Sequence, residues 1–138
     1  MSPLPVEVLE SRATGEALGL IVLAAARAAK AGKSLAEVAQ TAKDMMPRVN
    51  LLITLETLYY LARGGRIGKA QAWAGGLLNM KPILEVPVSQ GIVCPVQRVR
   101  TKSKAMEKMI EIMAQRVGDA KPVHVIVHCA DNVSEAKN

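Results

Sequence analysis

Residues 61–68 have the sequence LARGGRIG, and this stretch decides how the middle of the chain folds. Because glycine tolerates positive φ angles, the pair Gly64-Gly65 is expected to end a short helix and to let the backbone approach a ligand closely. The next helix is expected to begin at Lys69, and helix N-termini attract anions. The guanidinium of Arg66 is therefore placed to bind a carboxylate or phosphate through two hydrogen bonds. The same loop chemistry also fits a plain helix end followed by a surface arginine.

Upstream of this loop, apolar spacing and turn residues predict two helices and two short strands. Gly32 ends the first helix, and Ser34 with Glu37 has the spacing of a capping box at the start of the second. Pro47 cannot continue that second helix. In chain order we expect a strand over residues 6–9, a helix over 16–30, a helix over 35–46 and a strand over 49–54.

Downstream of the loop, the pattern changes to a hairpin and a long amphipathic helix. Pro87 and Pro95 fall within the hairpin, and because proline cannot donate to a ladder, this hairpin belongs at a sheet edge or carries a bulge. Thr101 caps the amphipathic helix, and Gly118 ends it. In chain order we expect a short helix capped by Thr54, a helix over residues 69–78, strands over 82–88 and 92–98, a helix after Thr101, a strand over 123–129 and a helix that begins at Asp131-Asn132.

The composition describes one soluble globular chain with a basic surface. Its 138 residues are 50% apolar and 22% charged, and the formal net charge is +6. Such a charge leaves a basic nucleic-acid-binding domain open as an alternative function. The chain has one Trp, two Tyr and no Phe, so few rings are present on which bases would stack. We therefore expect no nucleic-acid partner, since an anionic small ligand or an acidic protein explains the charge equally well.

No segment of the sequence predicts a membrane span, a secretory signal or a disulfide framework. The most apolar run, Ala17–Ala26, is shorter than the ~18 residues that a spanning helix needs. Glu7 and Glu10 precede this run, which is the wrong order for a signal peptide. Cys94 and Cys129 are too few for a disulfide framework, and we expect both to be reduced. These features predict a cytoplasmic protein.

Three ordered blocks of sequence closely resemble the DegV family. They are residues 56–67 (ETLYYLARGGRI), residues 77–84 (LLNMKPIL) and residues 99–101 (VRT). The resemblance extends back to Glu10-Ser11, where Glu replaces an expected Asp, and forward to Val127, so it covers nearly the whole chain. One GGRI motif would be weak evidence, but three blocks in the same order and at the same spacing are specific.

This resemblance implies an α/β fold, namely a two-layer α/β domain with a mixed, largely antiparallel sheet flanked by helices. Residues 1–32 would form the last strand and helix of a truncated N-terminal α/β domain, and residues 33–138 would form the C-terminal domain. The Thr and Ser residues with which the family's N-terminal domain holds a fatty-acid carboxylate have no counterpart in this sequence. We therefore expect a fragment that lacks part of the site.

The resemblance also implies a non-catalytic lipid-binding subunit, rather than an enzyme, with no cofactor. Such a protein would enclose one long-chain fatty acid and present its carboxylate to a separate fatty acid kinase subunit for phosphorylation. Each buried methylene contributes ~0.8 kcal/mol, so the tail can dominate the affinity while polar groups fix the orientation.

The DegV motifs also assign the candidate site residues. The residues expected to contact the lipid are Gly64, Gly65, Arg66, Ile67 and Ile83. Arg66, from the GGRI motif, is the candidate nearest to the carboxylate or phosphate. Arg98 and Arg100, at the VRT block, are better placed to contact the partner or the transferring phosphoryl group.

A few other possibilities rest on single residues. His124 and His128 would share one face of the last strand, but no third ligand is evident, and we expect no metal site. Cys94 has no identifiable base beside it, so a nucleophilic role has little support. A small hydrolase or transferase that uses Arg66 is a third candidate function. An exposed half-tunnel would also favour a homo-oligomer.

Overall fold

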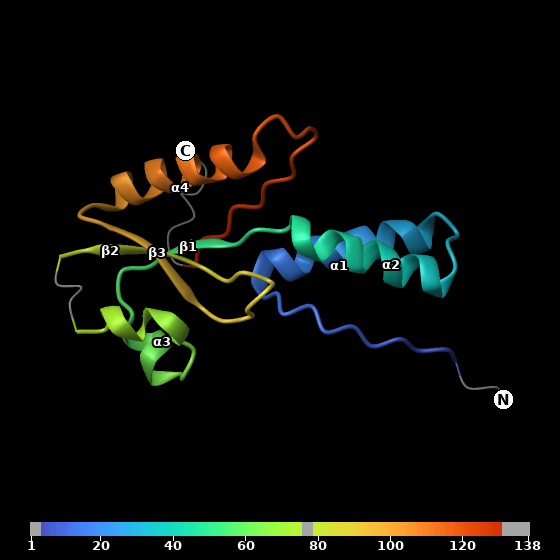
Figure 1. The fold of residues 1–138 in the computed structure, drawn as a ribbon, viewed down its shortest axis with the longest axis horizontal. Coiled ribbons are helices and arrows are strands. Elements are labelled where there is room, and N and C mark those ends of the chain that lie inside the picture. Colours follow the sequence, from blue (N-terminus) through green and yellow to red (C-terminus); the bar gives the residue numbers. More distant parts are fainter. Residues whose placement is uncertain (1–3, 76–78, 131–138) are drawn as a thin grey trace.

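The computed structural model describes residues 4–75 and 79–130 and shows two lobes (Figure 1). One lobe is a helical hairpin made of α1 (Gly15–Lys30) and α2 (Leu35–Met45). The other lobe contains a three-stranded sheet with helical segments on both faces. The two helices of the hairpin are confirmed, and their bounds agree with the sequence-based prediction to within one residue.

A capping box and a small apolar core stabilise the helical hairpin. The Ser34 N–H donates to Glu37 Oε2 over 2.9 Å, and the Glu37 N–H donates to Ser34 Oγ over 3.4 Å, which is the predicted reciprocal pattern. The pKa of Glu37 lies below its usual value, chiefly because the Ser34 side chain donates a hydrogen bond to it. Ala17, Ile21 and Ala42 are buried where the two helices meet.

The sheet is antiparallel and consists, in spatial order, of β1 (Leu52–Thr54), β2 (Lys81–Glu85) and β3 (Cys94–Val99). Ile83 pairs with Gln97, whereas Leu84 pairs with Pro95, so the register shifts by one residue. Pro95 therefore lies in an edge strand beside a bulge, a position at which proline is tolerated. The predicted hairpin and its irregularity are confirmed, although its strands are shorter than expected.

The central strand β2 is covered on both faces. The remaining helical segments are η1 (Met46–Arg48, 3-10), α3 (Tyr59–Arg63), η2 (Gly68–Trp73, 3-10) and α4 (Lys102–Val117). On one face, a buried cluster joins β2 to the segment that carries α3 and η2, and it contains Leu58, Ile67, Ala70 and Leu84. Ile83 is also fully buried, and because side chains alternate along a strand it faces the other side, toward α4. The predicted α/β class, with a largely antiparallel sheet flanked by helices, is confirmed.

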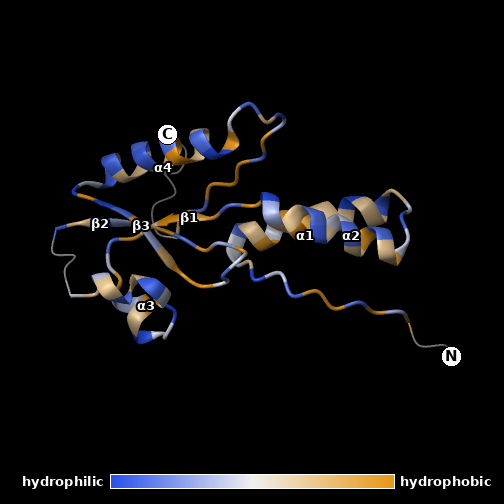
Figure 2. Ribbon diagram, in the orientation of Figure 1, coloured by the Kyte–Doolittle hydropathy of each residue, from blue (hydrophilic) through white to orange (hydrophobic). Residues whose placement is uncertain are grey.

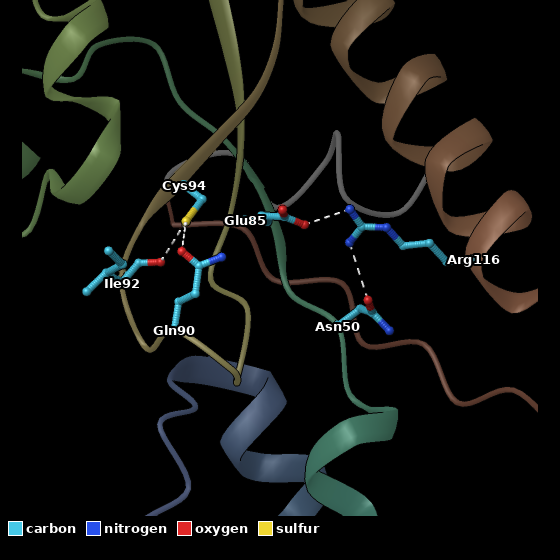
Figure 3. Close-up of polar contacts among 6 residues, drawn as sticks. All are labelled: Asn50, Glu85, Gln90, Ile92, Cys94 and Arg116. Carbon is cyan, nitrogen blue, oxygen red and sulfur yellow. Dashed lines mark hydrogen bonds and ion pairs between the residues drawn. The ribbon is translucent and has the colours of Figure 1, made fainter.

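The two ends of α4 are fixed by different polar contacts. At its start, Thr101 Oγ1 accepts a hydrogen bond from a backbone N–H of the first turn, which confirms the predicted cap. Near its end, Arg116 reaches toward β2 and the segment before β1 (Figure 3). Its guanidinium lies 2.6 Å from Glu85 Oε2 and 3.3 Å from Asn50 Oδ1. The ion pair with Glu85 and the hydrogen bond to Asn50 together link the C-terminal end of α4 to both segments.

Two predicted strands do not form. Residues 6–9 and 123–129 have no ladder partner, and the prediction of strands there is wrong. The side chains of Val6, Val8 and Val125 are 80%, 89% and 52% exposed. Figure 2 shows hydrophobic residues interspersed with hydrophilic ones along both segments. The apolar alternation is present in the sequence, but a strand needs a neighbouring strand to pair its N–H and C=O groups, and no described segment provides one.

The start of α3 also differs from the prediction. Thr54 is the last residue of β1 and does not cap the helix, whose N-cap position is Leu58. Instead, Thr57 Oγ1 accepts a hydrogen bond from the Tyr59 N–H over 3.0 Å. The threonine nearer to the helix makes the local contact because a hydroxyl reaches only the next turn of backbone.

After the double glycine, η2 takes the place of the first part of the predicted helix over residues 69–78. Ala70 is fully buried and Trp73 is half-buried against the same cluster. A spacing of three residues suits the three residues per turn of a 3-10 helix, so both side chains contact the sheet. Residues 76–78 and the predicted helix after Asp131-Asn132 lie outside the described residues.

Candidate functional site

The double glycine ends α3 as predicted. The backbone N–H groups of the loop turn back on the helix, with Gly64 donating to Tyr60 O over 2.9 Å and Arg66 donating to Leu61 O over 2.8 Å. Gly65 has a φ of 67°, a conformation that glycine adopts without a steric penalty. The carbonyl groups of Tyr60 and Leu61 are therefore satisfied, and these two bonds fix the path of the chain into Arg66.

A further glycine, Gly68, lets the loop pack closely against the β2–β3 hairpin. Gly68 has a φ of 53°, and a Cβ atom at this position would collide with the backbone of Val93. The next residue, Lys69, donates its N–H to Val93 O over 2.8 Å. Between Gly65 and Gly68, Ile67 is buried in the cluster beneath α3 and η2. The loop is thus held on both sides, and only its polar residues remain at the surface.

Arg66 is exposed and folds back over its own loop. Its Nη1 atom donates a hydrogen bond to the carbonyl oxygen of Gly64. A guanidinium carries five N–H donors, and a carboxylate or phosphate needs only two of them. The geometry therefore positions Arg66 at the surface beside the double glycine, where an anion in solution can reach it.

The other predicted site residues lie in separate surroundings. Arg98, on β3, places its guanidinium carbon 5.0 Å from the centre of the Trp73 ring, a cation–π contact. Arg100 is exposed just after β3. Ile83 is 0% exposed inside the sheet lobe. The structure brings Gly64, Gly65, Arg66 and Ile67 together as one loop and places Ile83, Arg98 and Arg100 on or beside the adjacent hairpin.

Two contacts near the loop were not predicted from sequence. Arg63 Nη1 donates to Tyr59 Oη over 3.4 Å, and Trp73 lies under Arg98. The first pair has the i, i+4 spacing that brings side chains together on a helix, so its signal was present in the sequence. The second depends on how β3 packs against η2, and no local pattern reports that arrangement.

Two shallow cavities lie elsewhere, and Arg66 lines neither of them. One has a volume of about 230 Å³ beside Glu85, Pro87 and Arg116. The other has a volume of about 220 Å³ and is apolar, with Ile21 and Val22 of α1 in its wall. Pockets that enclose a small organic ligand usually occupy roughly 300–1,000 Å³. Neither cavity alone encloses a long acyl chain.

The histidines and cysteines do not form a reactive cluster in the described part of the chain. The shared strand face expected for His124 and His128 is wrong, because that strand does not form. His128 Nδ1 contacts Glu16, and the hydrogen bond from His128 is the main reason why the pKa of Glu16 lies below its usual value. Cys94 is buried, with Sγ 3.5 Å from Gln90 Oε1 (Figure 3).

The described residues contain no cluster of metal ligands, no membrane-spanning helix and no disulfide. No group of three His, Cys, Asp or Glu side chains comes close enough to hold a metal ion. None of the helices between residues 4 and 130 is long and apolar enough to cross a bilayer. Neither Cys94 nor Cys129 forms a disulfide within the part of the chain that the structure describes.

These features define a small α/β domain. Its antiparallel sheet carries on one face an ordered double-glycine loop, and an anion can reach the exposed Arg66 on that loop. Comparison with known proteins gives this domain its family. The family model "Uncharacterised protein, DegV family" matches residues 1–138. The chain belongs to the DegV family.

Curated relatives support the same assignment. A DegV domain-containing protein of Streptomyces coelicolor is 41% identical over 127 residues, which cover 92% of this chain and 44% of the relative. A DegV domain-containing protein of Mycobacterium bovis is 40% identical over 126 residues, covering 91% of this chain and 44% of the relative. The chain thus spans less than half the length of the relatives that it matches.

Solved structures share the fold. A fatty-acid-binding DegV family protein from Thermus thermophilus is 33% identical with a TM-score of 0.77, and the match covers 86% of this chain and 42% of the other. A DegV family protein from Ruminococcus gnavus, solved with vaccenic acid, is 30% identical with a TM-score of 0.69 and coverage of 83% and 40%. DegV from Bacillus subtilis, described as a fatty-acid-binding protein, is 30% identical with a TM-score of 0.64 and coverage of 78% and 38%.

The close approach of Gly68 to the backbone of Val93 joins the loop to the hairpin. Substitution Gly68→Ala should destabilise the protein by about 2–4 kcal/mol, because a Cβ atom strains the positive φ and also collides with Val93. Chemical denaturation measures the free energy of unfolding. Gly65→Ala is the matched control, since Gly65 has a similar φ of 67° but open space around it. Equal losses for the two variants would show that the contact with Val93 is unimportant.

The second prediction concerns Glu56, which precedes α3 and forms an ion pair with Lys81 of β2. The hydrogen bond from Lys81 is the main reason why the pKa of Glu56 lies below its usual value of 4.5. Because the folded pKa is lowered, the pair stabilises the protein above pH 4.5 and is lost as the pH falls through the folded pKa. Substitution Lys81→Met should raise the pKa of Glu56 in an NMR titration, and an unchanged pKa would contradict this assignment. Lys33→Met is the control.

Proposed function

We propose that this protein binds a long-chain fatty acid and has no catalytic role of its own. The observation that carries the proposal is the 33% identity and TM-score of 0.77 to the fatty-acid-binding protein of Thermus thermophilus. The chemistry of the chain fits this role, since its interior is built almost entirely from aliphatic side chains. Flexible aliphatic groups accommodate an alkyl tail, and each methylene that they cover contributes ~0.8 kcal/mol.

This chain would supply one part of the lipid site. Its two cavities are too small for an acyl chain, and the matched relatives are more than twice its length. We assign residues 1–32 to the end of an N-terminal α/β domain and residues 33–138 to a C-terminal domain. The boundary falls in the turn between α1 and α2, which pack against each other. The rest of the site would come from sequence that the relatives carry outside the matched region.

The double-glycine loop would receive the acidic end of the lipid. Gly64 and Gly65 let the backbone approach the carboxylate, and Arg66 would supply charged donors at the surface. Ile67, buried beneath the loop, would support the wall behind it, and Ile83, buried on the other face of β2, would support that strand from the side of α4. The tail itself would contact aliphatic side chains, since an alkyl group gains nothing from the cationic surface.

The bound carboxylate would then be phosphorylated by a separate fatty acid kinase subunit in the cytoplasm. One carboxylate oxygen would attack the γ-phosphorus of ATP, forming a C–O–P linkage while the bond to the β-phosphate oxygen breaks and ADP leaves. Arg98 and Arg100 would contact the partner or the transferring phosphoryl group, where positive charge stabilises the transition state. This division of roles needs no metal or cofactor held by the lipid-binding subunit.

Native mass spectrometry tests the proposed function most simply. The full-length protein, purified from a bacterial host, should carry one fatty acid per protomer, detected as an added mass and identified after extraction. The physical reason is that burial of a long tail gives slow dissociation during purification. A spectrum without added mass, also after incubation with oleate, would contradict lipid binding.

Substitution Arg66→Ala tests the role of the loop. In the full-length protein it should leave the fold and the bound lipid unchanged, because the tail provides most of the affinity. It should slow acyl-phosphate formation by the kinase subunit by roughly 10- to 100-fold, the value of a charge-assisted hydrogen bond of ~1.5–3 kcal/mol. Arg27→Ala, which removes an exposed arginine from α1, is the control. Unchanged phosphorylation would remove Arg66 from the mechanism.

A further inference from the structure

The turn of the β2–β3 hairpin, residues 87–91, joins the two lobes of the structure. Two hydrogen bonds close its backbone, because Pro87 O accepts from the Gln90 N–H over 2.9 Å and from the Gly91 N–H over 2.8 Å. Val88, inside the turn, packs against the apolar cluster of the helical hairpin. A turn of the sheet lobe therefore contributes to the core of the other lobe.

Gly91 brings the turn against the chain just before α1. It has a φ of 67°, and a Cβ atom at this position would lie 3.1 Å from Arg12 Cβ, which is closer than an ordinary van der Waals contact. Arg12 itself has a φ of 51°, a conformation that residues other than glycine rarely adopt. Such a conformation persists only where the surrounding structure holds it, so the start of α1 is fixed against the turn.

On its other side, the turn holds the double-glycine loop. Gln90 Oε1 accepts a charge-assisted hydrogen bond from Lys69 Nζ over 2.5 Å, and Cys94 Sγ lies 3.5 Å from the same oxygen (Figure 3). The Lys69 N–H also donates to Val93 O over 2.8 Å. Lys69 therefore binds the hairpin through both its backbone and its side chain. Arg66 precedes it by three residues, so the position of the turn determines the position of the loop.

We propose that Gln90 and Gly91 are positioning residues for the lipid site, because their turn keeps the start of α1 and the double-glycine loop at one fixed separation. This inference rests on the proposed function and deepens it. α1 belongs to the end of the N-terminal domain in our assignment, so the turn determines where that domain lies relative to Arg66. Both residues act through the residues that they hold, Lys69 and Arg12, rather than by touching the lipid. A binding constellation works only when its groups are held to within about 0.5 Å.

Carbon-13 NMR of bound oleate tests the side of the turn that holds the loop. Full-length protein is loaded with oleate labelled at its carboxyl carbon and at its terminal methyl group. Gln90→Met keeps the length of the side chain but has no oxygen to accept from Lys69. In this variant the carboxyl resonance should move or broaden by more than its wild-type linewidth, whereas the methyl resonance should stay. Gln90→Glu, which retains an acceptor oxygen, should leave the carboxyl resonance close to its wild-type position.

A second variant tests the side of the turn that faces α1. Gly91→Ala places a Cβ atom against Arg12 and should displace the turn. The amide resonance of Lys69 should therefore shift in the nitrogen–proton correlation spectrum of the full-length protein, also without lipid. Gly32→Ala is the matched control, because Gly32 has a positive φ of 80° but, in the described chain, open space around it. It should leave the Lys69 resonance unchanged.

The outcomes separate the positioning role from the proposed function. A wild-type protein that binds no oleate overturns the proposed function, whereas a Lys69 shift in Gly91→Ala alone would still support the coupling between α1 and the loop. An unchanged carboxyl resonance in Gln90→Met, with oleate bound, overturns the positioning role and leaves lipid binding intact. Joint movement of the carboxyl and methyl resonances would indicate general loosening and would also overturn it. If Gly91→Ala does not fold, the two Gln90 variants decide.

Discussion

The burial of β2 from both sides is the constraint on which the rest of the sheet lobe depends. Ile83 and Leu84 are neighbours in sequence and are both fully buried, so one strand attaches to two helical layers at once. Leu84 holds the segment that carries α3, η2 and the double-glycine loop. Ile83 faces α4, which is also tied to β2 through Arg116 and Glu85. Any change in the register of β2 would exchange these two faces, because side chains alternate along a strand.

This arrangement explains how a cationic loop can be both exposed and ordered. Ile67 is buried beneath the loop, and Gly68 lies directly against the backbone of Val93, so the loop is anchored at the point where it leaves the surface. Arg66 projects from this anchored base. A loop that is already ordered binds an anion at a smaller entropic cost than a flexible one.

The sequence predicted those parts of the fold that depend on local signals. The capping box at Ser34 and the cap at Thr101 placed two helices correctly, because their hydrogen bonds join residues only three positions apart. The segments at 6–9 and 123–129 were predicted as strands and do not form ladders, since strand pairing depends on a distant neighbour that a local pattern does not specify. The direction of the Arg66 side chain was likewise not predictable from the motif, because it depends on the carbonyl group beside it.

The central claim is that the aliphatic surface of this chain covers an alkyl tail while the double-glycine loop faces the carboxylate. A crystal structure of the full-length protein with its bound fatty acid tests this most directly. The account predicts electron density for the alkyl chain along aliphatic side chains of this half, with the carboxylate oriented toward the loop that carries Arg66. Density for the lipid that lies away from this half, or a carboxylate that points away from the loop, would contradict it.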